Sequence, residues 1–288
     1  MPAVLESLLD MLLEHRVSCA PHVLTRLVGE LGGHPATIRE VAERLSPAQR
    51  YGAASLPTPL PLVPSIVEVF GDRELAAADR DLLLAVSLCL DDRLEPLLEL
   101  DGRDADVIAG GPVGHELRLR AGRITLVDPR LAIWIRQASG AGAVAAMHER
   151  LGVVFARRVD PLNAAWHRAR SSLRGRPSAA PELIRIARQL SEGGHSTKAL
   201  LLASEAETHA TGSDRDEARV VAGASAIGAG LLSDAVDQLS ALFPDGDESH
   251  RLQALAALLI AQSTLRGSVP DVEPGDFRPQ SDDAADWH

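Results

Sequence analysis

The apolar residues of segment 1–51 recur at the spacing of helices that bury one face. Pro21, Pro35 and Pro47 each suit the first turn of a further helix, where the missing N–H is not needed. Gly32-Gly33 is suited to ending the second helix, and Ser46 to capping the fourth. We therefore expect a lid-like helical segment over residues 1–51. Its first buried face is Leu5, Leu8, Leu9, Leu12 and Leu13.

Residues 52–64 interrupt this pattern with four prolines. Proline at this density excludes helix and favours an extended strap, so we place a domain boundary here.

The pattern of apolar and polar positions over residues 65–140 predicts helices followed by a β-hairpin. Residues 115–120 and 123–127 alternate apolar and polar positions around a turn at Ala121-Gly122, which is typical of two paired strands. Asp128-Pro129 then suits the start of another helix, through Ile135. Helices before a hairpin give the plan of a winged-helix-like module. The three expected helices are Ala76–Leu90, Asp92–Leu100 and Asp104–Ala109.

Residues 141–266 are predicted to form a helical array. After two helices broken at Asp160-Pro161, an internal repeat appears, in which a shift of 36 residues places Gly194 on Gly230 and Ala199 on Ala235. Helical pairs of this length resemble tetratricopeptide (TPR) stacking, although ordinary helical hairpins fit two units equally well. A capping helix is expected over 248–265, and residues 267–288, acidic and proline-rich, are expected to be disordered. The predicted fold class is mainly α: a lid-like bundle, a winged-helix-like arm with one β-hairpin, and short TPR-like hairpins.

Composition supports stacked helices. Apolar residues make up 45% of the 288 residues but aromatic residues only 3%, so the core must consist mainly of Leu, Val, Ala and Ile. The formal charge of −11 repels a phosphate backbone, so we do not expect nucleic-acid binding by the chain as a whole.

Nothing in the sequence predicts export or membrane insertion. Cys19 and Cys89 lie among apolar neighbours and are expected to be buried thiols rather than a disulfide framework. The first residues lack the basic start of a signal peptide, and no run of residues reaches the length of a membrane span. The expected location is cytoplasmic.

No catalytic, metal or cofactor site is predicted. A phosphate-binding loop needs Gly-Lys-Ser/Thr after a strand, but the nearest segment, residues 192–198, has Thr197 before Lys198 and follows a helix. Met147-His148-Glu149 begins a zinc-binding helix pattern that Gly152 breaks, and His167 has no ligand partner at a suitable spacing. A histidine such as His167 is expected to be a helix-packing residue.

One segment is strongly basic. Only Glu149 and Asp160 oppose its arginines, so it is a candidate docking patch for an acidic protein or for nucleic acid. The alternative is an ordinary arginine-rich surface paired with acids elsewhere on an acidic chain. The candidate residues are Arg150, Arg157, Arg158, Arg168, Arg170, Arg174 and Arg176.

DNA binding by the winged-helix-like module is an alternative that its own residues weaken. The recognition helix would lie near residues 104–109, where Asp104 and Asp106 would face phosphates. No Lys or Arg lies between Asp104 and Gly114, whereas the hairpin offers Arg118, Arg120 and Arg123.

The order of several short motifs resembles the region after the ATPase core in large ATP-binding LuxR-type transcriptional regulators. These are relatives of the maltose regulator and of the signal-transduction ATPases. The resemblance covers roughly residues 15–245. It is carried by Gly32-Gly-His-Pro35, Leu45-Ser-Pro-Ala-Gln49, Leu56-Pro-Thr-Pro-Leu-Pro-Leu62, Asp79-Arg-Asp-Leu-Leu-Leu-Ala-Val-Ser87, Val127-Asp-Pro-Arg-Leu131 and Ala165-Trp-His-Arg-Ala169.

Two features of that family do not occur in this sequence, namely the Walker A and B segments and the LuxR-type helix-turn-helix. The resemblance implies that the lid turn lies near a nucleotide base. Gly33 and Pro35 could hold that place only if another chain supplied the phosphate site.

We therefore expect a non-catalytic regulatory or scaffold protein that acts by binding a protein partner or a small-molecule inducer, in the context of transcription control. The alternatives are a direct DNA-binding regulator and an assembly subunit for a separate ATPase.

Overall fold

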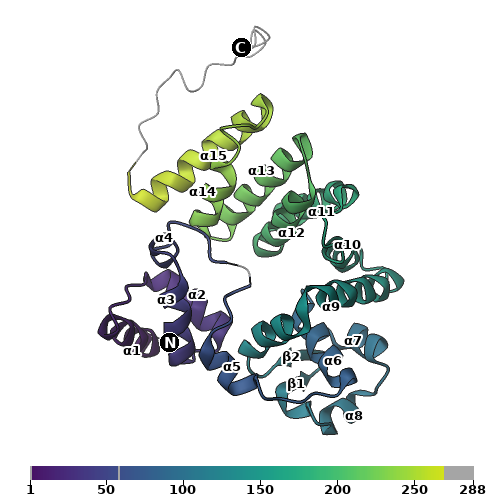
Figure 1. Cartoon of the computed structure of the whole chain (residues 1–288). Coiled ribbons are helices and arrows are strands. Elements are labelled where there is room, and N and C mark those ends of the chain that lie inside the picture. The colour runs from purple at the N-terminus through teal and green to yellow at the C-terminus, as the bar shows by residue number, and fades with distance from the viewer. Residues whose placement is uncertain (1, 58, 269–288) are drawn as a thin grey trace. The chain divides into compact units, whose positions relative to one another are not determined.

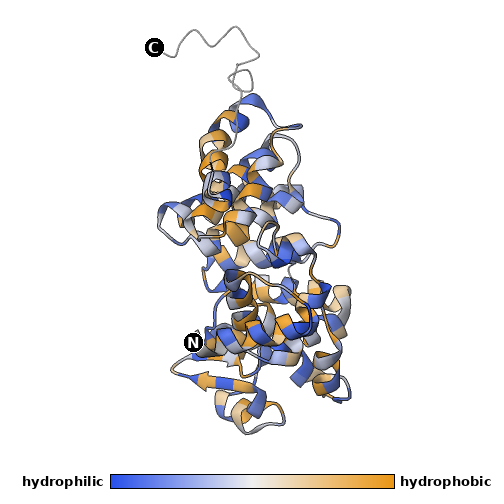
Figure 2. Cartoon of the chain, turned by 90° about the vertical axis from the view of Figure 1, so that its left-hand side faces the viewer, coloured by the Kyte–Doolittle hydropathy of each residue, from blue (hydrophilic) through white to orange (hydrophobic). Residues whose placement is uncertain are grey.

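The computed structural model describes residues 2–57 and 59–268 (Figure 1), and the predicted tail from residue 269 onward lies outside this part. The chain divides into two compact units, which we call unit 1 (Met1–Leu173) and unit 2 (Arg174–His288). The described residues form fifteen α-helices and one two-stranded antiparallel sheet, so the chain is mainly α-helical. Hydrophobic and hydrophilic positions lie next to each other along the helices (Figure 2). No helix in the described residues is both long and apolar enough to cross a bilayer.

The second, third and fourth helices begin where the prolines predict. Pro21, Pro35 and Pro47 each occupy a first helical position, and Gly32 ends the second helix in the left-handed conformation with φ of 66°. Ser46 and Gln49 form a reciprocal capping box, which satisfies two backbone N–H groups at the start of the fourth helix. The helices are α1 (Pro2–Glu14), α2 (Pro21–Leu31), α3 (Pro35–Arg44) and α4 (Pro47–Arg50).

The proline-rich strap is non-helical over residues 52–57 and 59–63, as predicted. It does not separate two cores, because Leu56, Leu60 and Val63 are buried in the same hydrophobic cluster as the helices on either side. A helix that the pattern does not predict, α5 (Pro64–Phe70), follows directly with Pro64 at its first position.

The middle of unit 1 contains three helices, a 3-10 turn and the hairpin. Leu117 pairs with Leu126 and Arg120 with Arg123, in the predicted register around Ala121 and Gly122. Both turn residues have positive φ, 50° and 74°, the geometry that matches the twist of paired strands. The elements are α6 (Ala77–Leu88), α7 (Leu94–Asp101), α8 (Ala105–Gly110), η1 (Gly114–Glu116), β1 (Leu117–Arg120) and β2 (Arg123–Leu126).

Unit 1 ends with α9 (Arg130–Arg157) and α10 (Pro161–Arg170). Gly140 has non-helical φ and ψ of 74° and 160°, so α9 is two helical stretches joined at a kink. The common core continues past this kink through Met147, Leu151 and Phe155 to Ala164. The compact unit therefore extends beyond the boundary that we predicted at residue 140.

Unit 2 is a succession of helices in which neighbours in sequence lie side by side (Figure 1). Gly194 and Gly230 have φ of 77° and 73° at the turns after α11 and α13, which agrees with the predicted 36-residue shift. Ala199 and Ala235 are both completely buried. The elements are η2 (Pro177–Ala179), α11 (Ala180–Glu192), α12 (Ser196–His209), α13 (Ser213–Gly228), α14 (Leu232–Ser240) and α15 (Glu248–Arg266).

Candidate functional site

The lid turn lies against the start of α9. A Cβ atom on Gly32 would be 3.2 Å from the ring of Pro129, and His34 Nε2 lies 3.7 Å from Asp128 Oδ2. Gly33 has φ of 75° and would meet no atom within 4 Å, while Pro35 opens α3. Atoms of this chain therefore fill the space beside Gly32, whereas the space beside Gly33 is open.

Arg130 connects α9 to the lid segment. Its Nη2 donates to Asp128 Oδ2 at 2.6 Å, and its Nη1 donates to Thr37 Oγ1 at 3.3 Å. Thr37 is completely buried and lies 2.9 Å from the hydroxyl of Ser65 at the start of α5. Burial alone would raise the pKa of Asp128, but the hydrogen bonds from Arg130 lower it, so this carboxylate stays ionised. The network joins α3, α5 and α9 inside unit 1.

The predicted docking arginines are divided between the two units and are not a bare basic surface. Arg150 donates to Asp81 at 2.6 Å, and Arg158 donates to Glu99 at 3.1 Å. Arg157 lies 4.0 Å from the same glutamate. Of the rest, Arg168 and Arg170 lie in α10, the guanidinium of Arg170 lying over the Trp166 ring, and Arg174 and Arg176 begin unit 2.

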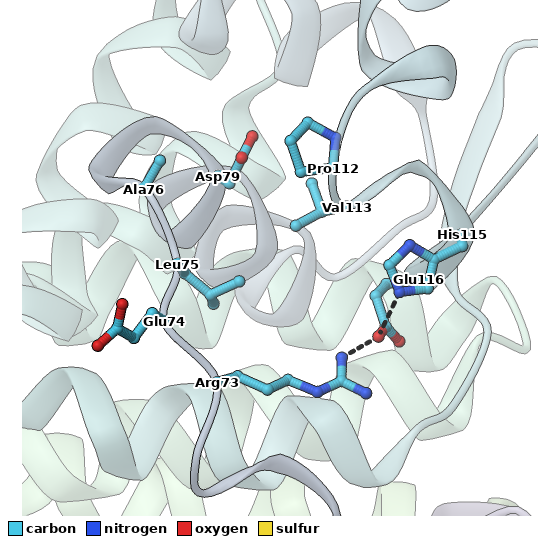
Figure 3. A pocket seen from close by; sticks show the side chains of 9 residues that line it. All are labelled: Arg73, Glu74, Leu75, Ala76, Asp79, Pro112, Val113, His115 and Glu116. Carbon is cyan, nitrogen blue, oxygen red and sulfur yellow. Dashed lines mark hydrogen bonds and ion pairs between the residues drawn. The ribbon is translucent and has the colours of Figure 1, made fainter.

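A pocket that the sequence did not predict opens beside the hairpin (Figure 3). Its volume is about 480 Å³. One wall is the loop between α5 and α6 with the first turn of α6, and the other is the segment from Pro112 to Glu116. Figure 3 shows Leu75 and Val113 between the polar residues at the two ends of the pocket. The lining residues are Arg73, Glu74, Leu75, Ala76, Asp79, Pro112, Val113, His115 and Glu116.

The polar groups of the pocket are mostly acidic. Arg73 pairs with the buried Glu116, which also lies 3.1 Å from His115 Nε2. Asp79 is buried and accepts from Arg103 at 2.7 Å, so its charge is balanced outside the lining. Glu74 is exposed at the rim. The pocket thus offers carboxylates beside an apolar wall.

The contacts of Asp128, Arg130, Thr37 and Ser65 described above are called the lid network here. The side chain of Arg73 links the pocket to this network. Its guanidinium lies 4.8 Å from the centre of the Phe70 ring, and that of Arg130 lies 5.9 Å from the same ring. Phe70 in turn lies 6.0 Å from the Trp134 ring, centre to centre. The Phe70 ring is therefore in contact both with the cation of the pocket and with the cation that holds Asp128.

A second group that was not predicted from the sequence is a pair of histidines, one on α9 and one on α10. His148 Nδ1 and His167 Nδ1 lie 2.8 Å apart, so one ring donates to the other. The exposed fractions are 1% and 0%, and Phe155 stacks on His167 at 5.3 Å between ring centres. Within residues 2–57 and 59–268, neither Nε2 atom has a hydrogen-bond partner. His167 is thus a packing residue, as its position in the sequence led us to expect.

The environment keeps both imidazoles neutral. Burial lowers the pKa of His148 to about 2, with further lowering by His167, Arg170 and Arg136. Burial also lowers the pKa of His167 to about 3, with Arg170 acting in the same direction. Burial and the neighbouring arginine therefore both favour the neutral form of this pair.

In unit 2, Asp216, Asp247 and His250 bring three potential ligand atoms within 4.8 Å of one another. Their mutual contacts explain this arrangement. Asp247 caps α15 by accepting from the backbone N–H of His250 at 3.0 Å, and Asp216 accepts from the N–H of Asp247 at 3.0 Å. The cluster is a helix start held by hydrogen bonds.

Two of these groups carried a local signal in the sequence, the lid turn and the arginine-rich segment. The Gly-Gly-His-Pro turn marked the lid, whereas the pocket and the histidine pair depend on contacts between residues 19 to 43 positions apart. No family model, no curated protein and no solved structure matches this chain.

Proposed function

We propose that the chain is a non-catalytic regulatory protein that binds a small-molecule inducer in unit 1 and a protein partner through its helical surfaces. The observation that carries this proposal is the contact of the Phe70 ring with both Arg73 of the pocket and Arg130 of the lid network. A ligand that displaces Arg73 from Glu116 changes what Phe70 packs against, and Phe70 contacts the residues that hold the lid turn.

The arrangement of the elements agrees with the resemblance to the region after the ATPase core in LuxR-type regulators. Helices α6, α7 and α8 precede the hairpin in the order of a winged-helix-like module, and α11 to α14 form two helical pairs of TPR-like length. Arrays of helical pairs provide extended surfaces for protein partners. We infer a role in transcription control from this resemblance.

The chemistry of the pocket indicates the class of inducer. Glu74 and Glu116 favour a ligand with a positively charged or hydrogen-bond-donating group, and Leu75, Pro112 and Val113 favour an apolar portion. A small amine or a basic amino-acid derivative meets both requirements.

Direct DNA binding receives less support from the proposed recognition helix. Helix α8 has only six residues, begins after Asp104 and carries Asp106 in its first turn. On the hairpin, Arg123 is paired with Asp92. Gel shifts at low and moderate salt distinguish this alternative, because charge-driven DNA binding must weaken steeply with salt.

The inducer proposal is tested by fluorescence of the full chain carrying Trp166→Phe and Trp287→Phe, which leaves Trp134 as the reporter beside Phe70. The titrants are putrescine and arginine methyl ester, with glutamate as the anionic comparison. We expect a saturable change in Trp134 emission with a cationic titrant and none with glutamate.

Glu74→Gln is expected to weaken binding of the cation about tenfold, which corresponds to the loss of roughly one charge-assisted contact. Glu6→Gln makes the same charge change on the exposed face of α1 and should leave binding unchanged. Equal effects of the two variants, or no saturable response to either cation, would count against this pocket as the inducer site.

A further inference from the structure

Helix α15 has two apolar faces. Ala254, Leu258 and Ala261 are buried against the preceding helices. On the opposite side, Leu252 and Ile260 are 51% and 58% exposed. A helix that packs on one side only is expected to be polar on the other, and no described residue of unit 2, up to residue 268, covers this second apolar face. We call it the α15 stripe: Leu252, Leu255, Ala256, Leu259 and Ile260.

The repeat explains why the stripe exists. Gly267, the C-cap of α15, has φ of 69°, and Gly194 and Gly230 have φ of 77° and 73° one residue after the C-caps of α11 and α13. The buried positions of α15 also lie 36 residues after Ala218, Ala222 and Ser225, which are buried in α13. Helix α15 is thus the equivalent of α13, the first helix of another pair.

The packing of α14 on α13 shows how closely a covering helix can approach the equivalent face of α15. α13 contacts both α14 and α15. At Gly223 the approach is so close that an added Cβ would lie 2.3 Å from Leu239 Cγ of α14. The equivalent position of α15 belongs to the stripe. Residues 268–276, which would carry the next helix, include Pro270 and Pro274, so the sequence does not predict a covering helix there.

We propose that the α15 stripe is covered by the α15 stripe of a second copy of this chain, paired antiparallel about a twofold axis at Ala256. This register places Leu252 against the partner's Ile260 and brings the small side chain of Ala256 to the crossing point, where it allows close approach. It also brings Glu248 near Arg266 of the partner subunit. Opposite charges meet at both ends, and the helix dipoles oppose each other.

The inference concerns unit 2 alone, so it is independent of the inducer pocket. Sedimentation of the full chain over a range of concentrations tests it directly. The weight-average mass should rise from 30.6 kDa toward twice that value as concentration increases. Leu252→Glu and Ile260→Glu should each weaken the dimer at least about tenfold, because they place charge in the apolar centre.

Val153→Glu is the matched control. Val153 is a helical valine of unit 1 that is 48% exposed, so the same change there should leave the mass distribution as in the wild type. Circular dichroism and the melting temperature report whether each variant remains folded. A dimer equally weakened by Val153→Glu, or equally strong in Leu252→Glu and Ile260→Glu, would overturn the proposal.

Charge reversal tests the register. Glu248→Arg alone places two arginines at each end of the dimer, and Arg266→Glu alone places two glutamates there, so each variant should associate more weakly. Mixing the two variants in equal amounts restores opposite charges at both ends, and the mixture should dimerise like the wild type. A mixture no stronger than either variant would contradict the antiparallel arrangement.

Disulfide trapping tests the twofold centre. Ala256→Cys should oxidise readily to a covalent dimer, because twofold-related residues at the crossing lie within reach of a disulfide. Thr264→Cys, exposed on α15 but outside the stripe, should not. A chain that stays at 30.6 kDa at every concentration, with no trapping through residue 256, would refute self-association.

Discussion

The two histidines between α9 and α10 illustrate how burial changes the chemistry of a single residue. In the folded chain the pKa values of His148 and His167 are about 2 and about 3, whereas an unfolded histidine has a pKa of about 6.5. Between these values the unfolded state binds more protons than the folded state. The free energy of unfolding is therefore highest above pH 6.5 and falls as pH decreases below it.

This gives a prediction for His167→Phe. Urea unfolding at pH 7.5 and at pH 5.5 should show that the wild type loses about 1.4 kcal/mol more stability than the variant between the two values, because one buried neutral imidazole has been removed. His195→Gln, a change at an exposed histidine, should retain the wild-type dependence. If His167→Phe and wild type respond identically to pH, the pair is not held neutral by burial.

Single residues also mark what sequence could and could not predict. The sequence places Gly194 and Gly230 at equivalent turns, and both adopt the left-handed conformation that favours glycine. It could not bring Arg73 to Glu116, since nothing local to either residue records a partner 43 positions away. The pocket beside the hairpin is built from such distant partners, and this is why it was not predicted.

At the scale of elements, the start of α10 depends on Asp160. Its Oδ1 accepts from the backbone N–H of Asn163 at 3.1 Å, and its other carboxylate oxygen pairs with Arg93. Burial alone would raise the pKa of Asp160, but hydrogen bonds from Arg93 and Asn163 lower it. The side chain thus caps one helix and ties it to the start of α7.

Asp160→Ala should lower the free energy of unfolding by about 1–2 kcal/mol, through loss of the cap and of the contact with Arg93. Asp160→Asn keeps a capping oxygen and should lose less than half of that amount. Chemical denaturation followed by circular dichroism gives both values. The assignment of Asp160 as a cap does not survive if the two variants are equally destabilised.

Most elements could be predicted because proline, glycine and alternation act locally. The strand pair around Ala121-Gly122 and the helices that open at Pro21, Pro35 and Pro47 follow directly from such signals. Helix α5 was missed because Pro64 was counted with the strap rather than as a first helical residue. A single proline is compatible with both, and the burial of Phe70 in the common core favours the helix.

At the scale of the molecule, the predicted segments and the compact units differ. Residues 1–51, 65–140 and the first part of the predicted array all contribute to one core in unit 1. The strap has the composition of a linker, yet Leu60 and Val63 are 4% and 1% exposed. Composition gives the backbone conformation of such a segment but does not show which surface its leucines cover.

We propose that the chain acts through the surfaces with which it binds other molecules, and not through hydrolysis of a nucleotide. Lys198, the sole lysine, is exposed in the first turn of α12 after a helix–helix turn and is not in a phosphate-binding loop. The most direct measurement is steady-state ATP turnover by the full chain with Mg²⁺, compared with Lys198→Ala. We predict no turnover above background in either protein; saturable ATP hydrolysis that is lost in Lys198→Ala would contradict this account.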